Sequence, residues 1–196
     1  DGRTPASPCV PQRAPRFAAE LDEARAQYDA EINYIDTHLG RLLKTLQDLG
    51  WSESTLLVLT ADHGEEFGDH GGTKHKEALY EEVLRVPLIV SWPGSIAAGQ
   101  RIGTPVTLLD VLPTVLEATG QKPPDRLQGI SLLPAITGEG AEPARESLVI
   151  EDDQQRALLG HAAPSRMRTL VTPRWRMTIT QGDSWGELYD LSNDPH

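Results

Sequence analysis

The sequence predicts an α/β sandwich with a mainly parallel central sheet, followed by a small C-terminal antiparallel sheet. Two observations predict the sandwich: a long amphipathic helix leads into a short apolar strand, and a second apolar strand follows after a loop and a short helix. A third, a set of short, partly alternating runs in the last third, predicts the antiparallel sheet. We therefore expect a linker at 1–16, the α/β part at 17–146 and the small sheet at 147–196.

The long helix is predicted from about Phe17 to Gly50. Apolar residues recur there at steps of three and four, which places them on one stripe. The stripe consists of Leu21, Ala24, Tyr28, Ile32, Ile35, Leu39, Leu42 and Leu46. Gly50 is expected to end the helix, because glycine readily adopts the left-handed conformation. Residues 1–16 hold four prolines and no apolar period, which is typical of an exposed linker.

Two continuous apolar runs, at 55–60 and 87–91, are too short for helices. Such runs are typical of strands covered on both faces, and this favours parallel pairing. A further helix is predicted at 107–119, kinked or split at Pro113. The stretch 121–146 is rich in proline and glycine, and the runs at 148–150, 168–171 and 174–179 carry the predicted antiparallel sheet.

Length and composition limit the possible functions. With 196 residues and 38% apolar content, the chain can bury one core. A net charge of −11 without a run of Lys and Arg disfavours a nucleic-acid surface. No apolar stretch reaches the roughly 18 residues of a membrane span, and the single cysteine, Cys9, excludes an internal disulfide. Compartment and oligomeric state leave no signal in the sequence.

Metal-capable residues lie directly after the first apolar strand. Asp62 offers a hard anionic oxygen and His63 an imidazole nitrogen, and Gly64 eases a turn that can aim both side chains at one ion. In parallel α/β sheets, ligands gather at the carboxyl ends of the strands. An Asp–His pair after a strand is nevertheless more often a turn residue beside a hydrogen-bonded histidine, so the pair alone leaves both interpretations open.

Further polar residues follow in the same glycine-rich loop, namely His70, Lys74, His75 and Lys76. Taken by themselves, the lysines are explained as solvated surface residues. His70 is explained equally well as a histidine that stabilises the loop.

Five blocks of this sequence together resemble the sulfatase family of the alkaline-phosphatase superfamily. The central two are TADHGEEFGDHGG and LYEEVLRVPLIVSWPG, in matching order and spacing. The others are YDAEINYIDTHLGRLLKTL before them, and TLLDVLPTVLEATGQKPPDRLQGISLLP and ELYDLSNDP after them. The resemblance covers about residues 17–196 and implies the C-terminal portion of an alkaline-phosphatase-like fold.

The resemblance implies a site and a substrate class. Asp62 and His63 match the family's later pair of metal ligands, for one divalent ion that is calcium by family, with manganese or zinc as alternatives. A basic residue that contacts the charged ester matches His75 or Lys76, with His75 favoured, and His70 is a candidate for the surrounding shell. The implied substrate is a small-molecule or carbohydrate sulfate ester.

The nucleophile is the main departure from the family pattern. Cys9, Val10, Pro11, Gln12 and Arg13 fit the family's C-x-P-x-R motif literally. The genuine motif opens a helix far upstream of the DHG block, whereas Cys9 lies in a proline-rich loop about fifty residues before it, with no preceding apolar strand or Asp-Asp pair. We therefore expect no nucleophile here, and almost no activity from the isolated chain.

The sequence leaves two other functions open. One is a phosphonate or phosphate ester hydrolase of the same superfamily, and the other is a non-catalytic module. The chain ends in turn-forming residues, which suggests a piece of a longer protein. Such a piece is expected to expose an apolar sheet edge and helix face.

Overall fold

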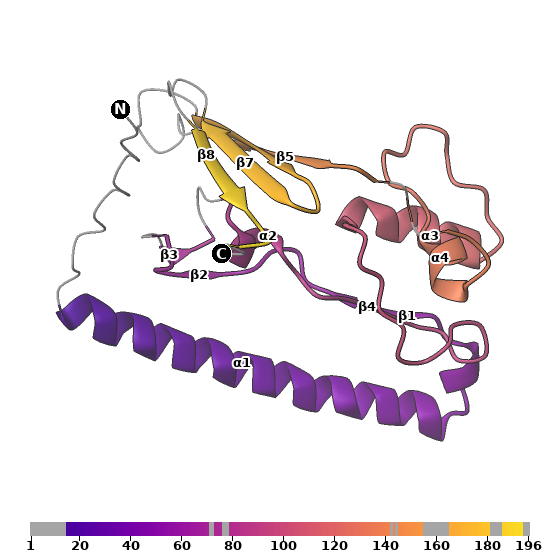
Figure 1. The fold of residues 1–196 in the computed structure, drawn as a ribbon. Coiled ribbons are helices and arrows are strands. Elements are labelled where there is room, and N and C mark those ends of the chain that lie inside the picture. Colours follow the sequence, from indigo (N-terminus) through magenta and orange to yellow (C-terminus); the bar gives the residue numbers. More distant parts are fainter. Residues whose placement is uncertain are drawn as a thin grey trace.

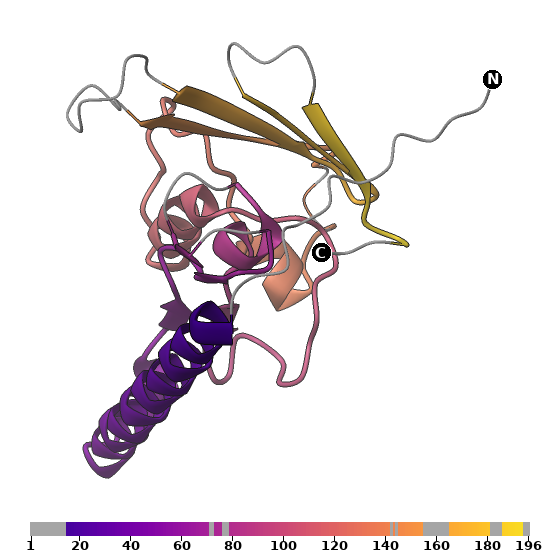
Figure 2. The same ribbon diagram turned by 90° about the vertical axis from the view of Figure 1, so that its left-hand side faces the viewer.

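The computed structural model describes residues 15–70, 73–75, 79–141, 143, 145–154, 165–180 and 186–193. The long helix α1 (Pro15–Asp48) is followed by a 3-10 turn, η1 (Ser52–Ser54), and strand β1 (Leu57–Thr60). A hairpin of β2 (Glu66–Phe67) and β3 (Thr73–Lys74) leads to the one-turn helix α2 (Glu81–Leu84) and to β4 (Leu88–Ser91). In both ribbon views α1 lies on one side of this middle segment and the C-terminal sheet on the other (Figures 1 and 2).

Helix α1 confirms the predicted helix and its end. Gly50 has a φ of 71°, and the Trp51 N–H donates to the Leu46 carbonyl at 2.8 Å, so the last turn closes through a left-handed glycine. The apolar stripe is less covered than its spacing suggests. Four of its eight residues are 38–61% exposed: Tyr28, Ile32, Ile35 and Leu42. One contact of α1 is the edge-on packing of Tyr28 on Phe67, with ring centroids 5.3 Å apart.

The prediction of parallel pairing is wrong for the two apolar strands. β1 and β4 are antiparallel neighbours, with Leu57 opposite Ser91 and Thr60 opposite Leu88. Parallel neighbours need a crossover, usually a helix of several turns. Among the described residues of the connection, the structure places the hairpin and the four-residue α2 but no crossover helix of several turns. Within the described residues, no mainly parallel central sheet is present.

The predicted C-terminal antiparallel sheet is confirmed. It contains β5 (Leu148–Gln154), β6 (Ser165–Val171), β7 (Trp175–Thr180) and β8 (Gly186–Asp190), in the order β5-β6-β7-β8. Its buried side chains include the polar residues Thr169, Arg176 and Thr178. Arg176 forms an ion pair with Glu81 of α2, which ties the sheet to the middle segment.

A buried carboxylate, Asp110, organises the segment between β4 and the sheet. The predicted 107–119 helix is split into a 3-10 turn, η2 (Leu108–Asp110), and α3 (Val111–Ala118), so the break falls at Asp110 rather than at Pro113. Pro113 lies in the first turn of α3, where its missing N–H costs no helical hydrogen bond. A second short helix, α4 (Leu133–Thr137), follows.

Asp110 is fully buried and accepts four hydrogen bonds. Two come from the Arg145 guanidinium and one each from the N–H groups of Thr107 and Ile130. Burial by itself would raise the pKa of the Asp110 carboxyl. The hydrogen bonds from Arg145, Ile130 and Thr107 outweigh burial, so its pKa lies below the ordinary value.

A close backbone contact fixes the loop after β1. The Gly64 N–H donates to the Val83 carbonyl at 2.8 Å, and the Glu65 N–H donates to the Glu82 carbonyl at 3.0 Å. A Cβ atom at Gly64 would lie 1.9 Å from the Glu82 carbonyl oxygen and 3.2 Å from Val83 Cα. Only glycine therefore allows the loop to approach α2 this closely.

The Asp110 network predicts a pH-dependent stability. Asp110→Asn should lower the free energy of unfolding at neutral pH by about 3 kcal/mol, because one partner of a buried ion pair is removed. Since the folded-state pKa is depressed, this stabilisation is present above the unfolded pKa of about 3.9 and is lost as the pH falls through the folded value. Denaturant titrations at neutral and acid pH should show the two proteins converging in acid. Asp125→Asn, at a side chain that is 95% exposed, is the matched control. A stability gap of constant size across the pH range would contradict this account.

The close contact at Gly64 predicts that Gly64→Ala destabilises the protein by about 1–3 kcal/mol, because the added methyl forces the loop away from α2. Gly103→Ala is the control, since a Cβ there meets nothing within 4 Å. Thermal unfolding of the two variants measures the difference. Equal melting temperatures would show that the loop does not depend on this contact.

Candidate functional site

Asp62 and His63 lie directly after β1, as the sequence predicts. The His63 N–H donates to Asp62 Oδ1 at 3.0 Å, which orients the carboxylate. His63 Nδ1 lies 2.8 Å from the Gly64 carbonyl oxygen. A carbonyl only accepts, so Nδ1 carries the proton and Nε2 of the neutral ring keeps its lone pair.

The remaining donor atoms of Asp62 and His63 lie close to each other. His63 Nε2 lies 3.8 Å from Asp62 Oδ2, a separation that one cation can bridge. The His63 side chain is 42% exposed and that of Asp62 is 90% exposed, so an ion could reach both from solvent. The backbone hydrogen bond at Nδ1 is the arrangement that commonly fixes the ring of a metal-ligating histidine. The donor chemistry of Asp62 and His63 therefore fits a divalent ion.

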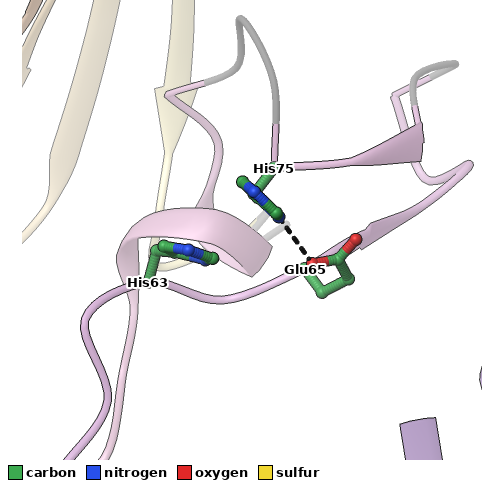
Figure 3. Close-up of side chains that lie close together, drawn as sticks. All are labelled: His63, Glu65 and His75. Atoms are coloured by element: carbon green, nitrogen blue, oxygen red, sulfur yellow. Dashed lines mark hydrogen bonds and ion pairs between the residues drawn. The ribbon is translucent and has the colours of Figure 1, made fainter.

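The β2–β3 hairpin brings His75 to the same place. Glu66 pairs with Lys74 and Phe67 with Thr73, so the same register places Glu65 opposite His75. His75 Nδ1 lies 2.9 Å from Glu65 Oε2, and the His75 ring stacks on His63 with centroids 4.1 Å apart (Figure 3). His63 lies two residues before Glu65 in the loop that leads into β2, and its ring contact with His75 brings the three side chains together.

Glu65 is a site residue that the sequence reasoning did not assign. Its carboxylate is 20% exposed and holds His75, while one atom from each of His63, Glu65 and His75 falls within 4.8 Å of the others. The signal in the sequence is the H-x-E spacing followed ten residues later by a histidine. That spacing becomes meaningful only once the hairpin register is known.

His70 makes contacts of a different kind. Its Nδ1 lies 2.7 Å from Glu82 Oε1, its N–H donates to Glu66 Oε1 at 3.3 Å, and its ring stacks on Tyr80 with centroids 3.8 Å apart. Burial, together with the charge of Glu187 and a hydrogen bond to it, raises the pKa of Tyr80 above its ordinary value. These contacts attach the hairpin to α2, as expected of a histidine that stabilises the loop.

The other candidates from the sequence lie outside what the structure describes. Cys9 and Lys76 belong to undescribed residues, and Lys74 is described only as part of β3. The choice between His75 and Lys76 as the ester-contacting residue stays a prediction, although His75 is the one that the structure places beside His63.

Two carboxylates, those of Asp62 and Glu65, belong to the site, and their negative charge favours cations there. The carboxylates of Glu66 and Glu82 instead contact His70. Among the described helices, none is both long and apolar enough to cross a membrane.

Comparisons with known proteins show the family of this chain. The family model described as Sulfatase matches residues 4–121, and the one described as N-sulphoglucosamine sulphohydrolase, C-terminal, matches residues 68–196. An N-acetylglucosamine-6-O-sulfatase of Bacteroides thetaiotaomicron is 38% identical over 177 residues, which are 86% of this chain and 30% of the relative.

Solved structures show the same relationship. A protein solved in complex with its substrate D-glucosamine-2-N,6-O-disulfate matches with a TM-score of 0.69 at 30% identity, covering 84% of this chain and 33% of that one. A phosphonate monoester hydrolase of Agrobacterium radiobacter matches with a TM-score of 0.77 at 28% identity, covering 89% and 36%.

The chain spans about a third of the length of the curated relatives that it matches. The two family models together reach from residue 4 to residue 196, and both describe sulfatases. This chain belongs to the sulfatase family.

Proposed function

We propose that this chain supplies part of the active site of a metal-dependent hydrolase of sulfate esters. The observation that carries the proposal is the convergence of Asp62 Oδ2 and His63 Nε2, at 3.8 Å, in the loop after β1. Membership of the sulfatase family supports the reaction class. Calcium is the first expectation from the family, and the nitrogen ligand keeps manganese and zinc as alternatives.

A sulfated carbohydrate is the proposed substrate class. A relative is named for a sulfated N-acetylglucosamine, and a structural neighbour was solved with a disulfated glucosamine. Both are sugars that carry an anionic ester.

Asp62 and His63 would hold the ion, each through one donor atom. The bound ion would supply positive charge that polarises the ester oxygens and offsets charge in the transition state. Gly64 keeps both donors in place through its contact with α2.

His75 is proposed to contact the oxygens of the ester. Glu65 holds its Nδ1, which leaves Nε2 as the ring nitrogen that can donate to substrate when protonated. Lys76 stays the alternative, and Cys9 has no assigned role. The described residues thus supply two metal ligands and one substrate contact.

A second candidate, phosphonate or phosphate ester hydrolysis, has one specific observation in its favour. The Agrobacterium phosphonate monoester hydrolase matches with a TM-score of 0.77. Sulfate and phosphonate monoesters share a tetrahedral anionic group, so the donors described here serve either. The relative rates on matched esters decide between them.

The test uses the polypeptide encoded by the whole reading frame that contains these residues. Its kcat/KM should be higher for an aryl sulfate than for the matched phosphate and phosphonate esters. Asp62→Asn and His63→Ala should each lower that value by more than about 100-fold, because losing even a group that merely supports a metal ligand costs about 10- to 100-fold.

The matched controls are Asp125→Asn and His38→Ala, an exposed carboxylate and a helix α1 histidine. Both should stay within about twofold of the parent, since surface changes have small effects. A higher rate on the phosphonate establishes the second candidate. No turnover on any ester overturns the hydrolase proposal and supports a non-catalytic module.

A further inference from the structure

We propose that His63, Glu65 and His75 form a second donor set that binds a divalent transition metal of the zinc class. This set shares His63 with the Asp62–His63 pair but adds one nitrogen and one carboxylate from elsewhere in the hairpin. The proposal goes beyond the hydrolase function, and zinc binding does not require that function to be correct.

The hairpin register assembles the three donors. Glu65 directly precedes β2, and the hairpin register continued by one residue places it opposite His75. Directly opposite side chains of an antiparallel pair are neighbours, which explains the 2.9 Å contact of His75 with Glu65. The loop before β2 brings the third donor to the same place, because the His63 ring stacks on that of His75 with centroids 4.1 Å apart (Figure 3).

The distances are close to those of a bound ion. One donor atom from each side chain lies within 4.8 Å of the other two. A tetrahedral zinc ion, with nitrogen ligands at about 2.0–2.1 Å, requires donors about 3.3 Å apart. Small rotations of the side chains therefore complete the arrangement. The 2.9 Å contact opens slightly, and the more distant donors approach.

The donor types select the metal. Two imidazole nitrogens and one carboxylate suit zinc and its neighbours, whereas calcium and magnesium prefer oxygen. Three protein donors also leave a fourth position for water. His63 and His75 are 42% and 46% exposed, which gives an ion access, while Glu65 is only 20% exposed and is held in place.

The shared histidine makes the two donor sets mutually exclusive. The neutral His63 ring offers one lone pair, at Nε2, while its Nδ1 donates to the Gly64 carbonyl. An ion held by Glu65 and His75 therefore competes with an ion held by Asp62. It also engages His75, the residue proposed to contact the ester.

The experiment measures binding of Zn²⁺ alone by calorimetry, and the visible absorption of Co²⁺ as a reporter of coordination, on the whole chain. We expect one equivalent to bind, with Glu65→Gln and His75→Ala each weakening it by about 10- to 100-fold and reducing the Co²⁺ bands. Asp62→Asn should bind Zn²⁺ within about twofold of the parent, because Asp62 is outside this donor set.

His38→Ala is the control, since His38 is a histidine of α1 and lies outside the hairpin. It should leave zinc affinity unchanged. Thermal melting without metal checks that each variant folds. If His75→Ala does not fold, the zinc affinity of Glu65→Gln alone tests the proposal.

The outcomes separate this proposal from the hydrolase proposal. Zinc affinity that survives both Glu65→Gln and His75→Ala, or that Asp62→Asn abolishes, overturns the second donor set. Hydrolysis that survives Asp62→Asn overturns the hydrolase mechanism and leaves the zinc result standing.

Discussion

The site depends on one backbone contact, the approach of Gly64 to the one-turn helix α2. Two hydrogen bonds, from the Gly64 and Glu65 N–H groups to the Val83 and Glu82 carbonyls, hold the loop after β1. There is no space between them for a side chain. This contact fixes the backbone that carries the His63 and Glu65 side chains. The hairpin register then determines where the His75 side chain lies.

Helix α2 contacts the C-terminal sheet and the hairpin as well as the loop after β1. The Glu81 carboxylate pairs with Arg176 of β7, and that of Glu82 pairs with His70 of the hairpin. Three consecutive residues of α2, Glu81 to Val83, therefore join the C-terminal sheet, the hairpin and the loop that carries the metal-capable donors. Buried charge has this role elsewhere too, because Asp110 and Arg145 connect segments 35 residues apart. Among the described residues, the buried apolar side chains are Leu79, Val83, Leu132 and Ile136, which leaves much of the positioning to these polar contacts.

The sequence allowed the elements to be predicted better than their pairing. Helix α1, its end at Gly50, strands β1 and β4 and the antiparallel C-terminal sheet were all predicted. A continuous apolar run favours parallel pairing without determining the direction of the neighbouring strand, which explains the wrong parallel assignment of β1 and β4. The described part of the connection contains only the single-turn helix α2 and the hairpin, which is not the crossover helix that the parallel prediction assumed.

The residues of the candidate site could likewise be predicted only in part. Asp62 and His63 could be recognised because they are adjacent and follow a strand. Glu65 could not, because a glutamate in a polar loop is ordinary and its partner His75 is ten residues away. Two-residue strands such as β2 and β3 have no periodicity to detect, so their pairing was not predictable.

The contacts made by Glu81 and Glu82 of α2 also affect the order in which the chain folds. The hairpin contact from Glu82 to His70 closes a loop of 12 residues, whereas the contact from Glu81 to Arg176 closes one of 95. Loop-closure entropy adds about 0.6 kcal/mol for each doubling of length, so the longer loop costs about 2 kcal/mol more to close. We therefore expect the local contacts around the hairpin to form before the C-terminal sheet packs against α2.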